Sequence, residues 1–193
     1  MIDKVKNLLI NPTKFWKEIE VTSLKKILFP FAFVLAAILP VSSVIGLFLF
    51  RNFLLHTIGL FRVILFLVVL SYCVAILVPL LTGYAISYLL PYFGSERNTI
   101  KTIAMTVYSV TPFWLASFLN IYPPLFPLSF LGFLYSLYIF FMGCLYYLGM
   151  NPERAIGFTL ISAGIWVIIT YIFAFVLGVL TFGGLVIGVP LRI

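Results

Sequence analysis

Five long apolar runs constrain this chain more than any other feature of its sequence. They cover roughly residues 27–50, 63–90, 100–121, 128–148 and 155–180, and no Asp, Glu, Lys, Arg or His lies in the middle of any run. About 20 residues of helix cross the hydrocarbon core of a bilayer, so each run is long enough to span it. Lipid offers no partner to backbone amides, and a helix satisfies them internally. The runs also lack the period-2 alternation of an outer-membrane barrel.

The composition agrees with a membrane protein and excludes several other classes. Of the 193 residues, 64% are hydrophobic and 9% are charged, whereas soluble domains are about 45–50% apolar and about 25% charged. A soluble globular domain, a disordered chain and a nucleic-acid reader are therefore excluded. We predict an all-α polytopic integral membrane protein. A short amphipathic N-terminal segment, residues 1–26, precedes a five-helix transmembrane domain, residues 27–193.

Residues 1–26, called the leader below, hold six of the twelve basic residues. Asn11-Pro12 predicts the start of a helix, with proline at its first position. Such a helix places apolar and aromatic side chains opposite lysines, which is typical of a segment lying in the headgroup layer of an anionic membrane. The predicted membrane-surface residues are Lys4, Lys6, Lys14, Phe15, Trp16 and Lys17. The alternative is a solvated, partly frayed leader.

The distribution of Lys and Arg predicts the orientation. With the N-terminus inside, nine of the twelve fall on inner segments, namely the leader and the turns that carry Arg97, Lys101 and Arg154. Three fall on outer segments: Arg51, Arg62 and Arg192. Because cytoplasmic loops carry the excess of basic residues, we expect the N-terminus in the cytoplasm and the C-terminus outside.

The spans show no constellation of residues that carries catalysis. Proton-coupled carriers place ionisable groups inside their spans, and here none lies at a span centre. His56 has no His, Cys or carboxylate near it in sequence, so a metal site is not expected. Serine and threonine hydroxyls within spans, such as Ser109 and Ser162, lack a partner base and are more typical of bonds to helix backbone. We predict no enzyme activity and no cofactor.

Small residues recur at spacings that let helices approach each other closely. Ser42/Gly46 and Gly83/Ser87 lie four residues apart, and Gly157/Gly164 lie seven apart. Such pairs favour packing within the bundle, with a dimer face as the alternative. Between the second and third spans, Pro91 predicts a helix end, Gly94 a left-handed turn and Ser95 a cap for the next helix.

Several short motifs resemble one known family. They are the leader stretch Leu8-Leu9-Ile10-Asn11-Pro12-Thr13-Lys14-Phe15-Trp16, the pair Gly83-Tyr84, the turn Pro91-Tyr92-Phe93-Gly94, the core Tyr108-Ser109-Val110-Thr111-Pro112, the hairpin at Pro123-Pro124 and the turn from Gly149 to Ala155. Together they resemble the Yip (Ypt/Rab-interacting protein) membrane family, over about 180 residues of the chain. On this resemblance the family-motif residues are Tyr84, Gly94, Tyr108, Ser109 and Pro112.

The resemblance implies a five-helix membrane domain with a cytoplasmic N-terminus. Eukaryotic members are implied to work in vesicle traffic and to contact Rab GTPases. Their Asp-Leu-x-Gly-Pro type motif and their long polar N-terminal region are missing from this sequence, so GTPase binding is not expected. The short leader is similar to that of prokaryotic members, which implies a prokaryotic plasma membrane.

Two functions follow as hypotheses. The first is a non-enzymatic protein that organises the membrane or scaffolds membrane or trafficking-type partners. Its partners would be membrane lipids and another membrane protein or a second copy, with no nucleic acid. The alternative is a small channel or carrier for a neutral or apolar solute. It rests on prolines such as Pro79 and Pro112, which free backbone carbonyls that can line a cavity.

Overall fold

The computed structural model describes residues 2–21, 23–49 and 60–179, and these are helical almost throughout. Two short helices, α1 (Ile2–Ile10) and α2 (Pro12–Glu18), form the leader. The remaining elements are α3 (Leu24–Ile27), η1 (Leu28–Ala32), α4 (Phe33–Ala36), α5 (Ile38–Leu49), α6 (Leu60–Ser87), η3 (Leu90–Phe93), α7 (Thr99–Ser109), α8 (Thr111–Ala116), η4 (Ser117–Ile121), η5 (Pro123–Leu128), α9 (Ser129–Tyr146) and α10 (Pro152–Gly178).

Five stretches of this bundle are long and apolar enough to cross a membrane. They are Leu28–Gly46, Val68–Ser87, Thr99–Ile121, Ser129–Tyr146 and Pro152–Val176. No strand occurs in the described ranges. The predicted all-α class and the five spans are therefore confirmed. The end of the first predicted run, the loop with Arg51 and His56, and the tail with Arg192 lie outside the described residues.

Prolines divide some spans and leave others intact. The helix α6 continues through Pro79, whereas the third span breaks at Val110, between α7 and α8, next to Pro112. Proline has no N–H and disfavours helix in the residue before it. The N–H of Phe113, in the first turn of α8, donates to the Ser136 hydroxyl of α9 at 3.2 Å. A neighbouring helix thus accepts an N–H from the first turn after the break.

The first span is interrupted twice, and the second interruption agrees with the bend that is predicted near Pro40. Its backbone is extended at Phe29 (φ −112°, ψ 126°), and the Phe29–Pro30 peptide is cis. A second interruption falls at Ala37, between α4 and α5. Pro40 lies in the first turn of α5, three residues after Ala37. Because proline has no N–H to donate and its ring crowds the carbonyl four residues earlier, Pro40 accounts for this interruption.

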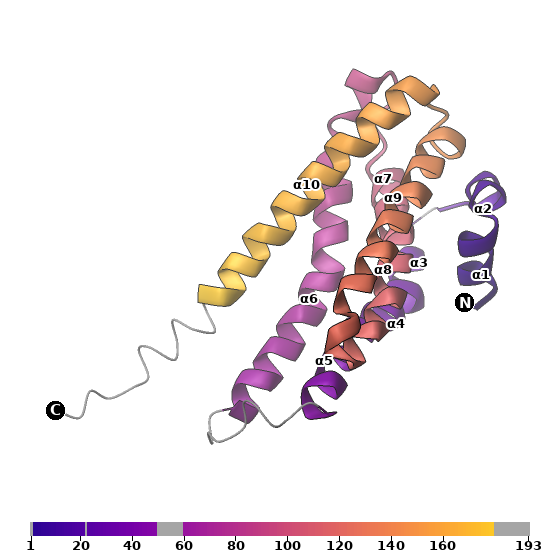
Figure 1. Cartoon of the computed structure of the whole chain (residues 1–193). Coiled ribbons are helices and arrows are strands. Elements are labelled where there is room, and N and C mark those ends of the chain that lie inside the picture. The colour runs from indigo at the N-terminus through magenta and orange to yellow at the C-terminus, as the bar shows by residue number, and fades with distance from the viewer. Residues whose placement is uncertain (1, 22, 50–59, 180–193) are drawn as a thin grey trace.

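The helix α7 occupies the centre of the bundle, with α6 and α9 beside it (Figure 1). Every residue from Thr102 to Ser109 is buried. In contrast, α10 leaves most of its surface exposed and diverges from the other spans towards its C-terminal end (Figure 1). A helix that is buried all round must have small neighbours or close fits on several faces.

Three glycines allow close contacts within the bundle, and one of them, Gly83, lies against α7. A Cβ on Gly83 of α6 would lie 2.6 Å from the Cα of Ile103 in α7. A Cβ on Gly46 would lie 2.3 Å from the carbonyl oxygen of Asn120, and one on Gly132 would lie 2.9 Å from that of Pro112. The packing roles of Ser42/Gly46 and Gly83/Ser87 are therefore confirmed.

The predicted close approach at Gly157/Gly164 is wrong. Gly164 has no neighbouring atom within 4 Å of a built Cβ, and Gly157 has only an ordinary contact with Phe93, at 3.4 Å. These two glycines lie on α10, which packs against the bundle over one face alone, so their spacing serves no helix crossing within the described residues. The alternative of a dimer face stays a prediction.

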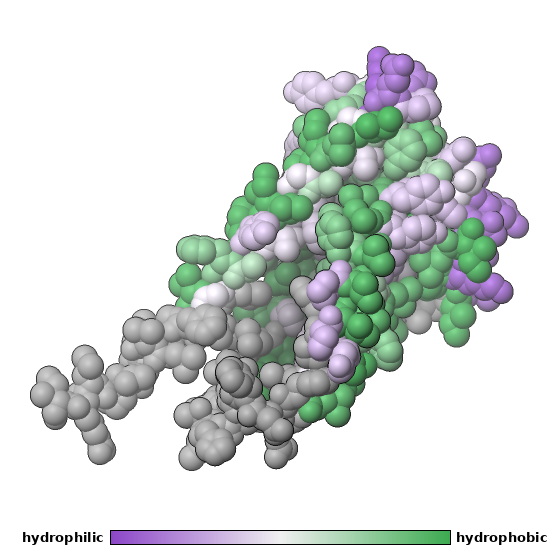
Figure 2. All heavy atoms as spheres, viewed as in Figure 1, coloured by the Kyte–Doolittle hydropathy of each residue, from purple (hydrophilic) through white to green (hydrophobic). Residues whose placement is uncertain are grey.

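The charged residues gather at one end of the bundle and on the leader. Those with described side chains lie in residues 2–25, in the turn and first helical residues at 96–101, and at 153–154. Figure 2 shows the most hydrophilic residues at that end and along the leader. The helix α2 and the turns that carry Arg97, Lys101 and Arg154 therefore share one end, called the charged end below, whereas α1 with Lys4 and Lys6 lies along the side of the bundle.

The turn between α6 and α7 keeps one predicted feature and corrects another. Gly94 has a left-handed backbone, with φ at +76°, as expected of a glycine in this turn. The cap of α7 is Asn98 and not Ser95, because the Asn98 side-chain oxygen accepts the N–H of Lys101 at 3.0 Å. Asparagine is among the strongest N-cap residues.

Gly83→Ala should lower the free energy of unfolding in detergent by about 1–3 kcal/mol, because the added methyl group meets the backbone of α7. Gly164→Ala is the matched control on the open face of α10, where replacing glycine in a helix is neutral or stabilises by up to about 1 kcal/mol. Thermal unfolding followed by circular dichroism measures both. Equal stability of the two variants would contradict the close α6–α7 contact.

Candidate functional site: two sides of the central helix

Two consecutive residues of α7, Tyr108 and Ser109, belong to different regions of the protein interior. Both are buried, with 2% and 3% of their surface exposed. The Tyr108 ring contacts the leader, whereas Ser109 lines a cavity among α6, α7, α9 and α10. The family-like motif at 108–112 therefore contributes both to the contact with the leader and to the lining of the cavity.

The aromatic residues of α2 anchor the leader to the bundle. The Trp16 indole N–H donates to the carbonyl oxygen of Ile139 in α9, at 3.0 Å, and the side chain is 1% exposed. Its ring centroid lies 5.4 Å from that of Tyr147. Phe15 packs against Tyr108 edge-on, with centroids 5.4 Å apart. Aromatic pairs at these distances stabilise a contact beyond simple burial, by about 0.5–1.5 kcal/mol.

This placement corrects the expectation that Phe15 and Trp16 insert into the headgroup layer. Both side chains enter the protein instead. The bundle offers the indole a carbonyl acceptor and two aromatic neighbours, Tyr108 and Tyr147. Gly143 of α9 leaves room for the ring, which lies 3.2 Å from where a Cβ would be. A lipid interface gives neither that acceptor nor a fixed aromatic packing, so the groove accommodates the pair better.

The first leader helix lies along the flank of the bundle (Figure 1). Leu8 is fully buried, and the Tyr135 hydroxyl of α9 donates to the carbonyl oxygen of Leu9. Tyr135 belongs to the half of α9 that is farther from the charged end. The helix α1 therefore runs beside the spans. Lys4 and Lys6 are exposed on it, and their role at a membrane surface stays a prediction.

Several cations at the charged end lie over tyrosine rings. Lys17 lies 5.1 Å from the centroid of Tyr146, and Lys101 lies 5.5 Å from that of Tyr147. These contacts hold the cations beside aromatic rings at the end of α9. Lys14 is exposed and forms a long ion pair with Glu18, at 3.9 Å.

A similar arrangement surrounds Tyr84, the first of the family-motif residues. Tyr84 is half exposed, and its hydroxyl shares a 2.6 Å hydrogen bond with that of Tyr88. The guanidinium of Arg97 lies 3.7 Å from the Tyr88 ring centroid. The hydrogen bond with Tyr84, together with Arg97, lowers the pKa of Tyr88. Tyr84 thus belongs to the charged end and takes no part in the buried site.

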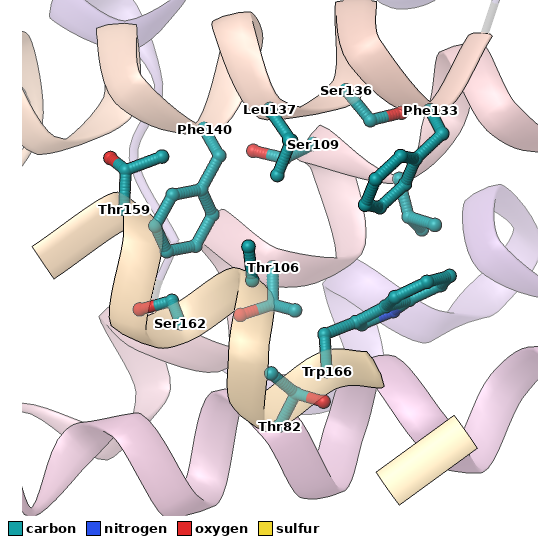
Figure 3. Close-up of a pocket in the computed structure, with 12 residues that line it drawn as sticks. Thr82, Thr106, Ser109, Phe133, Ser136, Leu137, Phe140, Thr159, Ser162 and Trp166 are labelled. Atoms are coloured by element: carbon teal, nitrogen blue, oxygen red, sulfur yellow. The ribbon is translucent and has the colours of Figure 1, made fainter. Parts of the chain in front are cut away.

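The other side of α7 faces a cavity of about 40 Å³ (Figure 3). Hydroxyl side chains from four helices surround it: Thr82, Thr106, Ser109, Ser136, Thr159 and Ser162. Phe140 and Thr159 lie at one end of it, and Phe133 and Trp166 lie at the other (Figure 3). No charged residue lines the cavity. About 10–15 Å³ on this measure holds one water molecule, so there is room for two or three.

The six hydroxyls divide into two groups. Those of Thr106, Ser136 and Thr159 donate to the carbonyl four residues earlier in their own helices, at 2.7–2.9 Å. Those of Thr82, Ser109 and Ser162 are buried and have no hydrogen-bond partner. Each of these three comes from a different helix. A buried hydroxyl without a partner within the protein is unfavourable by about 1–3 kcal/mol, so each of the three lowers the stability of this part of the bundle.

Sequence reasoning singled out Ser109 but missed the role of its neighbours. The prediction that the Ser109 and Ser162 hydroxyls bond helix backbone is wrong, because neither has a partner within the protein. Thr82 and Trp166 carried no distinguishing pattern. Their positions on α6 and α10 become informative only when those helices are placed beside α7. Pro112 is buried at the start of α8, where it sets the break after Ser109.

The described residues contain no group of three or more His, Cys, Asp or Glu that could hold a metal ion. His56 lies outside them. The residues that line the cavity are neutral: hydroxyl, aromatic and aliphatic side chains.

Comparison with known proteins places this architecture in a family. A search of the curated proteins and a search of the solved structures each found no match. The family model described as the Yip1 domain matches residues 6–176, which include the leader helix α2, the central helix α7 and most of α10. The match covers far more than half of the chain and agrees with the five-span helical fold, and so the protein belongs to the Yip1 domain family.

Proposed function

We propose that this protein organises the membrane, or scaffolds other membrane proteins, from its charged end without catalysing a reaction. The observation that carries the proposal is the anchoring of α2. Trp16 and Phe15 fix the helix to α7 and α9, while Lys14 and Lys17 stay exposed beside it. A basic surface held by the bundle keeps a defined position relative to the spans.

The proposed partners are membrane lipids and a membrane protein or second copy of the chain. Basic residues near the cytoplasmic leaflet attract its anionic lipids, with about 1 kcal/mol for each Lys or Arg close to the surface. Arg97 and Lys101 at the same end extend the basic surface of the leader. This supports contact with anionic headgroups in the cytoplasmic leaflet of a prokaryotic plasma membrane. Binding of a GTPase is not part of the proposal.

The double variant Lys14→Glu/Lys17→Glu should lose much of the stabilisation that anionic lipid gives the wild-type protein. We expect the wild-type melting temperature to be higher in nanodiscs of phosphatidylglycerol than in nanodiscs of phosphatidylcholine, and the difference to shrink in 0.5 M salt, because salt screens exposed charges. Differential scanning fluorimetry in both lipids measures this.

The charge-preserving variant Lys14→Arg/Lys17→Arg is the control and should behave as the wild type. It keeps the attraction to anionic lipid while altering the same two side chains. A lipid-dependent shift that is the same in all three proteins would argue against the electrostatic part of the proposal.

The orientation is tested separately. Glu96 is exposed in the turn between α6 and α7, at the charged end. In a background of Cys73→Ser and Cys144→Ala, a cysteine at Glu96→Cys should react with an impermeant maleimide only after the cells are permeabilised, because the positive-inside rule puts this end in the cytoplasm. Labelling of intact cells would reverse the proposed topology.

A channel or carrier for a neutral or apolar solute is the second candidate. The hydroxyl-lined cavity beside Val110 supports it, and so does a second cavity of about 190 Å³ that Pro79 helps to line. The first cavity has room for only two or three water molecules. That size favours a filled bundle over a passage for solutes.

On the scaffold proposal, proteoliposomes should admit glycerol no faster than liposomes without protein. Stopped-flow light scattering after an osmotic step measures the rate, and a known glycerol channel reconstituted in the same lipid provides the positive control. Protein-dependent uptake that Ser109→Ala alters would favour the carrier.

A further inference from the structure

We infer that α1 is a hinged arm, which in a bilayer leaves the side of the bundle and lies in the headgroup layer at the charged end. The arm turns about Asn11, while α2 keeps its place beside α7 and α9. The inference depends on the spans crossing the membrane. It does not depend on Lys14 or Lys17, which carry the proposed function.

The depth of α1 along the spans supplies the first part of the argument. Lys17 of α2 lies over the ring of Tyr146, at the end of α9. The Tyr135 hydroxyl bonds to the carbonyl oxygen of Leu9. Tyr135 precedes Tyr146 by eleven residues in one helix, so Leu9 lies about 16 Å from the charged end. The hydrocarbon core is about 30 Å thick, so this level is close to its centre.

The N-terminal half of α1 lies at a similar depth (Figure 1). Ile2 and Val5 line a space of about 420 Å³ together with Leu115 of the third span. Leu115 follows Lys101, at the charged end, by fourteen residues, which corresponds to about 20 Å of helix. In its docked position α1 therefore lies beside the hydrocarbon core.

Three charged side chains of α1 have no partner at this depth. Asp3, Lys4 and Lys6 are exposed, and within the described residues none of them forms an ion pair. A lysine near a span end reaches the headgroups with its four-carbon stem, but from the centre of the core that stem is too short. Each charge held there lowers the equilibrium constant for docking by about a hundredfold.

The contacts that hold α1 against the bundle do not offset these charges in lipid. Leu8 is fully buried, and the carbonyl oxygen of Leu9 accepts the Tyr135 hydroxyl. Burial of Leu8 favours docking where the side of the bundle meets water. Lipid chains are as apolar as a leucine side chain, so the same burial adds little in a bilayer. The hydrogen bond remains, and one such bond favours docking by about tenfold at most.

The junction between the two leader helices permits the movement. Asn11 has a non-helical backbone, with φ at −131° and ψ at 64°. Its N–H bonds to Asn7 at the end of α1, and its carbonyl oxygen accepts the N–H of Phe15 in α2. Pro12 has no N–H to bond back to α1. Within the described residues no backbone hydrogen bond joins α1 to α2, so a change at Asn11 redirects α1 without breaking either helix.

The amphipathic pattern of α1 suits the headgroup layer. Val5, Leu8 and Leu9 form the apolar side, which packs on the bundle in the docked position. At the membrane surface the same side enters the boundary of the acyl chains, and Lys4 and Lys6 meet the phosphate groups. The movement therefore exchanges one apolar surrounding for another and returns the charges to water.

The depth of a nitroxide spin label tests the inference on the full chain in nanodiscs of phosphatidylcholine. In a background of Cys73→Ser and Cys144→Ala, the label is attached at Asn7→Cys, an exposed position on α1. The control position is Leu160→Cys on α10, which is 67% exposed and about 12 Å along the helix from Pro152.

We expect a water-soluble nickel chelate to relax the label on α1, and dissolved oxygen to relax the label on α10. Power saturation of the electron paramagnetic resonance signal measures both. Relaxation by oxygen alone at the two positions would place α1 in the hydrocarbon core and would overturn the inference.

A distance measurement gives a second test. Labels at Asn7→Cys and at Leu131→Cys join α1 to an exposed position in the half of α9 farther from the charged end. Movement to the headgroup layer should lengthen their separation by about 16 Å, the rise from Tyr135 to Tyr146. Double electron–electron resonance measures the separation. A main population at the docked separation would contradict the inference.

Two variants test whether the charges cause the movement. Asp3→Asn/Lys4→Leu/Lys6→Leu removes all three and should raise the ratio of docked to undocked molecules by at least about a hundredfold. Lys4→Arg/Lys6→Arg keeps the charges and should behave as the wild type. An unchanged ratio in the first variant would count against the charges as the cause.

The test is separate from that of the proposed function. Lys14→Glu/Lys17→Glu leaves every residue of α1 unchanged, and phosphatidylcholine carries no net charge. In these nanodiscs α1 should therefore keep its surface position in that variant, whether or not the variant loses its response to anionic lipid. A docked α1 in this variant alone would show that α2 directs the arm, and would overturn the inference.

Discussion

The burial of α7 on all its faces is the constraint on which the rest of the structure depends. A helix surrounded by other helices has to meet them at short distance, and Gly83 allows the backbones of α6 and α7 to touch. Its polar side chains are buried away from bulk water, so they bond to the preceding carbonyls or remain without a partner within the protein. The break at Val110 adds a free N–H, and Ser136 of α9 accepts it. The close contact with α6, the buried hydroxyls and the proline break therefore all lie along the third span.

The leader shows how one sequence pattern supports two structures. Apolar residues opposite lysines suit a helix that lies in the headgroup layer, and they suit equally a helix that packs into a groove of its own protein. The outcome depends on whether such a groove exists. Here it does, because Gly143 leaves room for an indole beside a free face of the Ile139 carbonyl. The lysines stay outside in both arrangements, so the proposed electrostatic role does not depend on where the aromatic rings lie.

The two sides of the motif at 108–112 explain how one short stretch can serve separate purposes. Tyr108 fixes the leader, and so determines where the basic surface of α2 sits. Ser109, one residue on, points to a different set of helices and to a cavity that the leader does not touch. We expect a substitution at Tyr108 to loosen the contact between α2 and the bundle. We expect a substitution at Ser109 to alter the packing among α6, α9 and α10 instead. The membership of the Yip1 domain family agrees with this layout, since the matched residues include both sides.

The sequence by itself determined the class of the protein, the number of its spans and the left-handed turn at Gly94, because each follows from local chemistry: apolar length, unsatisfied backbone in lipid and the freedom of glycine. It also indicated which segments carry the basic residues. Tertiary structure alone decided that Trp16 is buried, that Gly83 is a close contact while Gly164 is not, and that Thr82, Ser109 and Ser162 line one cavity. These outcomes depend on which helices are neighbours. In a chain whose spans are apolar on every face, periodicity does not mark the side that faces protein, so neighbours cannot be assigned from the pattern of residues.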